Sequence, residues 1–139
     1  MAKIPGEVAE LLKDKGTPKI VATVGQNGVP NATIKGSVMA IDDTTLAFAD
    51  LYGGKSRTFS NLKETKQVSV LVFKFPFAPP LAAYQIKGKF DQYLTSGPVF
   101  DQFAKMIKEL IGADITGVAT MKVDSVYSQA PQDAGKKVA

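Results

Sequence analysis

The stretch KIVATVGQNGVPNATIKGSVMAIDDTTLAFA, residues 19–49, decides the fold class. It contains three β-rich segments separated only by short turns, with Asn-Gly at 27–28 and Asp-Asp at 42–43. Asn-Gly between such segments is the strongest short-range signal for a β-hairpin. Neighbouring parallel strands would need a crossover connection of about a dozen residues or more. We therefore expect a meander of three antiparallel strands at residues 19–24, 30–41 and 44–49.

The rest of the chain adds helices and further strands. Apolar spacing predicts helices at residues 5–15, over about ten residues from Arg57, and from 98 to a stop at Gly112. The stripe on the last of these helices is expected to pack in the core: Val99, Phe103, Met106, Ile107 and Leu110. Further strands are expected at residues 67–75, 82–93 and 117–127. Six mostly antiparallel strands with helices between and outside them predict a small α+β barrel. Residues 1–139 are expected to form one domain, in which 128–139 is a polar tail.

The composition excludes several kinds of chemistry. Cysteine and histidine are both absent from the 139 residues. Disulfides, thiol nucleophiles, thiolate or imidazole metal ligands and Ser-His-Asp catalysis are therefore excluded. Any reaction would take its reactive group from a bound cofactor.

Charge and hydropathy give little sign of a special partner or location. The formal charge is +4, but the lysines are scattered, so nucleic-acid binding is not indicated. Residues 1–13 contain a proline and two acids where a signal peptide needs an apolar segment. The longest apolar stretch, residues 68–84, is interrupted by a lysine and three prolines, which argues against a membrane span. We expect a cytoplasmic protein.

The start of the helix after residue 53 is a candidate anion site. Ser56 is suited to the N-cap, so its helix would begin at Arg57 and present free N–H groups. Lys55 and Arg57 add positive charge there, and Ser56 and Thr58 add hydroxyls. Cations at this end oppose the helix dipole unless an anion is bound. A solvated, capped helix start is the alternative. A nucleotide P-loop is excluded because Ala49 stands where its first glycine would be.

Four residues at this helix start, Arg57, Thr58, Asn61 and Leu62, are followed by the apolar segment QVSVLVF. This pattern resembles the FMN-binding split barrels related to pyridoxamine 5′-phosphate oxidase, especially the small FMN-binding proteins of that superfamily. The resemblance covers roughly residues 19–90, and the later helix and strand fit its order. It implies a six-stranded, mainly antiparallel split β-barrel with flanking helices. It also implies a homodimer that holds FMN in a cleft between two chains.

The same resemblance implies which residues bind the cofactor. Arg57 and Thr58 would hold the phosphate, assisted by Lys55 and Ser56. The flavin ring would lie along a strand edge and a neighbouring loop, formed by Thr33, Ile34, Lys35, Gly36, Ser37, Ala49, Asp50 and Leu51. A glycine at position 36 would let a flat ring approach the backbone, although a bend in a barrel strand explains it equally well. No catalytic residue and no metal ligand is implied.

Departures from the family pattern narrow the expected function. Pyridoxamine phosphate oxidases proper carry a C-terminal motif with arginine and histidine, whereas Arg57 is the only arginine here and histidine is absent. We therefore do not expect the vitamin B6 oxidase itself. An electron carrier with a redox partner protein and a flavin-dependent oxidoreductase with a small substrate both remain open. Haem-degrading relatives that use histidine fit less well. A family member that binds another cofactor, a deazaflavin or haem, stays open as an alternative.

A non-redox barrel that binds single-stranded nucleic acid is the alternative from a different functional class. Such barrels stack bases on aromatic side chains between basic residues. Phe75, Phe77 and Phe90 lie beside lysines and would be the platforms. Core packing of these phenylalanines is the simpler interpretation.

Overall fold

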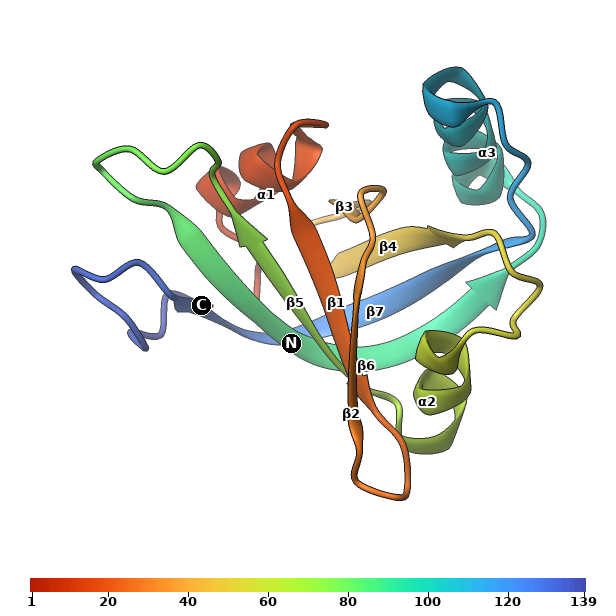
Figure 1. The fold of residues 1–139 in the computed structure, drawn as a ribbon, viewed down its shortest axis with the longest axis horizontal. Coiled ribbons are helices and arrows are strands. Elements are labelled where there is room, and N and C mark those ends of the chain that lie inside the picture. Colours follow the sequence, from red (N-terminus) through yellow and green to blue (C-terminus); the bar gives the residue numbers. More distant parts are fainter.

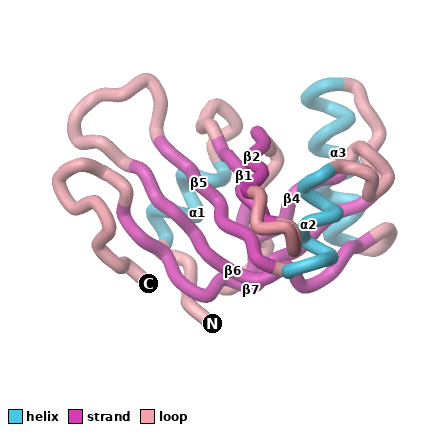
Figure 2. The backbone as a smooth tube through the Cα atoms, turned by 60° about the horizontal axis from the view of Figure 1, so that its bottom comes forward, coloured by secondary structure: helices cyan, strands magenta, loops and turns pink.

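The computed structural model describes residues 1–139, which form three helices and seven strands. In chain order these are α1 (Gly6–Lys13), β1 (Lys19–Val24), β2 (Pro30–Ile34), β3 (Met39–Ala40), β4 (Thr45–Asp50), α2 (Arg57–Thr65), β5 (Gln67–Phe73), β6 (Ala83–Leu94), α3 (Pro98–Ile111) and β7 (Gly117–Ser128). Figures 1 and 2 show a strongly curved sheet, with α2 and α3 toward one end and α1 toward the other. None of the three helices combines the length and the apolar character that a membrane crossing needs.

The strands form one antiparallel sheet in the order β2-β1-β5-β6-β7-β4-β3. This confirms the predicted α+β split barrel, but with seven strands instead of six. The single strand predicted at residues 30–41 is wrong, because β2 and β3 lie at opposite edges of the sheet. The three-stranded meander is wrong for the same reason. The segment instead forms two hairpins, β1–β2 and β3–β4.

A turn at Gly36 and Ser37 divides the predicted strand. The Lys19 ammonium donates a hydrogen bond to the Gly36 carbonyl at 3.2 Å. The Ser37 hydroxyl accepts one from the Ala49 N–H at 2.9 Å. These two contacts hold the chain where it crosses from one sheet edge to the other. The edges of the curved sheet are therefore joined covalently by residues 35–38 rather than by strand pairing.

The apolar residues gather in two clusters. The larger one fills the inside of the curved sheet, and the smaller one lies between β4 and α3. Strand β4 is buried along its whole length because alternate residues face the two clusters. Leu46 and Phe48 belong to the larger cluster, whereas Ala47 and Ala49 belong to the smaller one, together with Phe103 of α3. Packing on α3 thus fixes the end of β4 from which the next loop departs.

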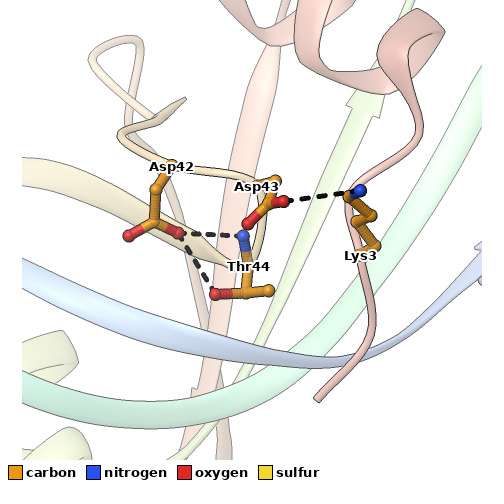
Figure 3. Close-up of polar contacts among 4 residues, drawn as sticks. All are labelled: Lys3, Asp42, Asp43 and Thr44. Atoms are coloured by element: carbon orange, nitrogen blue, oxygen red, sulfur yellow. Dashed lines mark hydrogen bonds and ion pairs between the residues drawn. The ribbon is translucent and has the colours of Figure 1, made fainter.

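The β3–β4 turn is held by local hydrogen bonds (Figure 3). One Asp42 carboxylate oxygen accepts from the Thr44 N–H at 2.9 Å and from its hydroxyl at 3.2 Å. Lys3 and Asp43 form an ion pair at 3.7 Å, but both side chains are exposed. Exposed pairs contribute only about 0–1 kcal/mol, so the aspartate-capped turn does most to order this hairpin.

The polar segment after β7 packs back on the sheet. The Val126 N–H donates to the Ala139 carbonyl at 2.9 Å, and the Val138 N–H donates to the Val126 carbonyl at 2.8 Å. Ala130 is buried in the same region. The polar composition of residues 129–139 therefore accompanies an ordered return along β7.

Gly88 is required by the close approach of β6 to β7. A Cβ atom there would overlap the Lys122 carbonyl oxygen, beside an irregularity in the β6–β7 register. We expect Gly88→Ala to lower the free energy of unfolding by about 1–3 kcal/mol, because the backbone must shift to make room. Gly6→Ala is the matched control, since a Cβ at Gly6 meets no atom within 4 Å. Urea unfolding of both variants measures the difference, and equal stabilities would contradict this reading of the sheet.

Candidate functional site

The start of α2 is capped as predicted. The Ser56 hydroxyl accepts a hydrogen bond from the Phe59 N–H at 3.2 Å. The N–H groups of residues 56–58 have no acceptor within the chain. The first turn contains no acidic residue, and the exposed Lys55 and Arg57 take part in none of the chain's three ion pairs. This helix start therefore offers free donors and unpaired positive charge, a combination that suits an anion.

Hydrogen bonds attach α2 to the β1–β2 hairpin. The Asn31 amide donates to the Thr58 hydroxyl at 3.2 Å, and the buried Asn61 amide donates to the Thr23 hydroxyl at 3.1 Å. The Thr65 hydroxyl donates to the Val24 carbonyl at 2.7 Å. The N-terminal turn of α2 is thus fixed beside β2.

Asp50 organises the loop between β4 and α2. It is only 3% exposed and accepts from the Tyr93 hydroxyl at 2.7 Å, the Tyr52 N–H at 3.0 Å and the Gly54 N–H at 2.8 Å. Burial alone would raise the pKa of Asp50, but these donors and the nearby Lys35 charge together lower it below the ordinary value. Gly53 and Gly54 have φ of 63° and 75°, a left-handed conformation that glycine adopts readily. An ionised carboxylate therefore holds the loop in a shape that needs its two glycines.

Lys35 lies between this loop and the helix start. Together with Asp50, Ser56 and Thr58 it lines one small cavity under the start of α2, which is too narrow to admit a water molecule. Its ammonium lies 4.9 Å from the centre of the Tyr52 ring. Burial lowers the pKa of Lys35, and the Asp50 carboxylate opposes that shift. The half-buried cation is thus held close to the free donors of the helix.

A groove of about 350 Å³, here named the α3 groove, lies next to that cavity. Its walls come from the segment between α1 and β1, the end of β2 with the β2–β3 turn, the end of β4 with its loop, and the last turns of α3. They are Lys15, Ile34, Lys35, Gly36, Ser37, Ala49, Leu51, Tyr52, Ile107, Leu110 and Ile111. Lys35 lines both the α3 groove and the small cavity, so the two spaces are neighbours.

Gly36 leaves the backbone of the α3 groove open. A Cβ at this position would meet no atom within 4 Å, and the residue does not have a left-handed φ. The Gly36 N–H has no acceptor within the chain. The folded chain itself therefore does not require glycine here, while a flat ligand against the backbone would benefit from the missing side chain.

The structure brings most of the predicted residues into these two adjoining spaces. Lys35, Asp50, Ser56 and Thr58 meet in the small cavity, and Ile34 to Ser37, Ala49 and Leu51 meet in the α3 groove. Thr33 lines neither space, but strand alternation puts it on the same face of β2 as Asn31. Lys55 and Arg57 are exposed on either side of Ser56 and line neither space.

The expectation that Leu110 of α3 packs in the core is wrong. Two residues of the site, Asn31 and Tyr93, were not predicted from the sequence. Leu110 is 47% exposed and lines the α3 groove instead of packing in the core, because it lies beyond the turn that contacts β4. The alternation of Asn31 with Thr33 and Lys35 could have revealed Asn31. Nothing near Asp50 in the sequence indicates Tyr93, which comes from a distant strand.

The three candidate stacking phenylalanines do not form one surface. Phe75 and Phe77 are exposed in the β5–β6 loop, so core packing is wrong for these two. Phe77 stacks on Phe73 with ring centres 5.8 Å apart. Phe90 instead packs edge-on against Phe59 of α2, also at 5.8 Å. Phe75 and Phe77 meet edge-on with ring centres 5.4 Å apart, but Phe90 packs on α2, so the three residues do not form one platform for a nucleic-acid strand.

The pKa of Asp50 provides a test of the loop. We expect Asp50→Asn to lower the free energy of unfolding by about 1.5–3 kcal/mol at pH 7, because charge-assisted hydrogen bonds are lost. Since folding lowers the pKa of Asp50, its stabilisation is complete above the ordinary value of 3.8 and is lost as pH falls through the lowered one. Urea unfolding from pH 7 to pH 2 should therefore show the difference from the unmodified protein shrinking in acid. A constant difference would contradict this role, and the exposed Asp91→Asn is the control.

Solved structures share this fold. HupZ of Group A Streptococcus is similar over 98% of this chain and 99% of its own, with 20% identity and a TM-score of 0.79. An FMN-binding protein from Syntrophomonas wolfei subsp. wolfei is similar over 86% of this chain and 82% of its own, with 18% identity and a TM-score of 0.77. An F420 reductase is similar over 88% and 98%, with 17% identity and a TM-score of 0.67. At these identities the likeness establishes the fold alone.

The sequence itself has a match at the level of a family. None of the curated proteins matches the chain. The family model described as pyridoxamine 5′-phosphate oxidase matches residues 4–138, which is nearly the whole chain. That span includes the start of α2, the β2–β3 turn and the last turns of α3. The chain therefore belongs to the pyridoxamine 5′-phosphate oxidase family.

Proposed function

We propose that this protein is a homodimeric flavoprotein that binds FMN and acts in electron or hydride transfer. The phosphate would lie at the start of α2, residues 55–58, and the ring in the α3 groove along residues 33–37 and 49–51. The observation that carries the proposal is that Lys35 lies under the start of α2, where backbone N–H groups are free, and also lines the largely apolar α3 groove.

The helix start fits a phosphate. Three backbone N–H groups there are free, and Lys55 and Arg57 are unpaired cations. Each charge-assisted hydrogen bond contributes roughly 1.5–3 kcal/mol, so three would contribute about 5–9 kcal/mol. A phosphate dianion would also reverse the unfavourable interaction of the two cations with the helix dipole.

The α3 groove fits an aromatic ring. Ligand sites are mostly apolar and carry a few well-placed polar groups. Here Ile34, Leu51 and Leu110 supply apolar contact, and the Gly36 N–H and the Lys35 ammonium supply polar contact. FMN would provide the redox chemistry, and the side chains would bind and orient it. This division of roles agrees with the absence of histidine and cysteine.

Exposed apolar residues around the groove support the homodimer. Ile34 is 78% exposed on the edge strand β2, and Ile111 is 66% exposed at the end of α3. Association costs roughly 4–15 kcal/mol in lost freedom, so phosphate contacts alone would barely hold FMN. A second copy that covered these residues would bury them and close the open side of the groove.

Other cofactors fit the same fold to different degrees. The F420 reductase of similar fold supports a deazaflavin as the second candidate, because its phosphate could use the same helix start. Haem fits less well, since its iron is usually held by histidine or cysteine and this chain has neither.

Arg57 tests the phosphate site. We expect Arg57→Ala to weaken FMN binding by about 10- to 100-fold, because one charge-assisted contact is lost. Binding of riboflavin, which has no phosphate, should be nearly unchanged. Lys63→Ala, in the last turn of the same helix, is the control. Flavin fluorescence titrations measure the affinities, and equal weakening of FMN and riboflavin would contradict the assignment. Tighter binding of F420 than of FMN by the unmodified protein would favour the deazaflavin.

The proposed homodimer has its own test. Light scattering of the purified protein should give twice the chain mass of 14.8 kDa. Ile34→Asp together with Ile111→Asp should shift the protein toward the single-chain mass and weaken FMN and riboflavin alike, because the groove loses its second wall. A single-chain mass for the unmodified protein that binds FMN tightly would refute the shared site.

A further inference from the structure

A second groove, of about 310 Å³, lies between the end of α1 and α3. We name it the lysine groove, because four lysines line it and Glu109 is the only acid among its lining residues. Its lysines are Lys13, Lys15, Lys19 and Lys105. None of them takes part in the chain's three ion pairs. The groove therefore carries an excess of positive charge that no contact within the chain balances.

Lys19 is the most unusual of these lysines. It is only 2% exposed, and buried lysines are normally paired with an acid. Its ammonium has three N–H donors, but the Gly36 carbonyl at 3.2 Å is its only hydrogen-bond acceptor. Burial lowers the pKa of Lys19, and the charge of Asp14 opposes this shift without forming an ion pair. An anion in the groove would relieve the cost of burying this cation.

The lysine groove adjoins the α3 groove. Both are lined by Lys15, Gly36, Ser37 and Leu110. The β2–β3 turn thus contributes to the lining of both grooves. A molecule in the lysine groove would contact the turn against which we place the flavin ring.

Five of the 13 residues that line the lysine groove are apolar. Leu12, Met39 and Met106 contribute to its lining. A volume of about 310 Å³ is at the small end of ligand sites, which span roughly 300–1,000 Å³. The size and lining suit a small molecule with an apolar body and an acidic group.

We propose that the lysine groove is an anion subsite, which binds the carboxylate or phosphate of the small molecule that exchanges electrons with the bound flavin. The redox part of this proposal rests on the proposed function, whereas the binding of an anion does not. Lys19 would bind the acidic group from the floor of the groove, and Lys105 would add charge at its α3 wall. The apolar body would point toward Gly36 and Ser37.

The purely structural alternative is that Lys19 only holds the Gly36 turn in place. In that case an added anion would not perturb the groove. Lys105 separates the two readings, because it lines the groove on α3 and has no hydrogen bond to the turn.

Two-dimensional NMR of the FMN-free and FMN-loaded protein tests the subsite, with inorganic phosphate and benzoate as separate probes. We expect both probes to shift signals of residues 13, 15, 19, 36–39 and 105. Lys19→Met and Lys105→Ala should each weaken this binding by about tenfold, and Lys63→Ala should leave it unchanged. Shifts with phosphate alone would assign the subsite to phosphate esters, and shifts with benzoate alone would assign it to carboxylates. No shift in the groove with either probe, or equal affinity in the two groove variants and the control, would overturn the proposal. Because Lys19→Met could disturb folding, Lys105→Ala decides if that variant is unstable.

The same spectra separate this proposal from the flavin assignment. Phosphate bound at the helix start would shift residues 55–58 and not the lysine groove. Absence of FMN binding with the groove shifts retained would overturn the proposed function but leave the anion subsite standing. Normal FMN binding without groove shifts would overturn the subsite alone.

Discussion

The turn at Gly36 and Ser37 is the constraint on which the rest of the structure depends. The chain must cross there from one edge of the sheet to the other, and the Lys19–Gly36 and Ala49–Ser37 hydrogen bonds hold it. If this crossing were lost, the two edge hairpins would not be tied together and the sheet could open. The same turn forms a wall of the α3 groove and of the lysine groove. The contact that joins the two edges therefore also shapes both candidate binding spaces.

Buried charge is distributed unevenly around this turn. Asp50 is buried, but donors from its own loop and from Tyr93 satisfy it. Lys35 has only partial compensation from Asp50, and Lys19 has one carbonyl. The negative charge of Asp50 thus stabilises the loop, whereas the positively charged Lys19 and Lys35 line the neighbouring spaces. Such an arrangement favours anionic ligands in the spaces beside the turn.

In the proposed redox function, this protein would contribute mainly by binding the cofactor. It has no histidine or cysteine, and its one well-buried carboxylate, Asp50, already accepts four hydrogen bonds. The groups that can bind and orient a ligand are the free backbone N–H donors at the start of α2, Gly36 in the β2–β3 turn, and the lysines around both grooves. These features are consistent with a site in which a bound cofactor supplies the reactive group.

Local sequence was enough to predict the antiparallel class, the three helices, the Ser56 cap and the residues of the helix start, because turns, caps and apolar spacing act over a few residues. The resemblance to the family also indicated residues 34–37, 49 and 51, which line the α3 groove, and Thr33 and Asp50, which do not. Local sequence could not separate β2 from β3, since residues 30–41 have strand-like composition throughout and only the closing of the sheet bends them. Tertiary structure alone brought Tyr93 to Asp50, left Leu110 exposed beside the groove, and buried Lys19 without an acidic partner. Each of those outcomes depends on contacts between strands far apart in the chain, which no local pattern encodes.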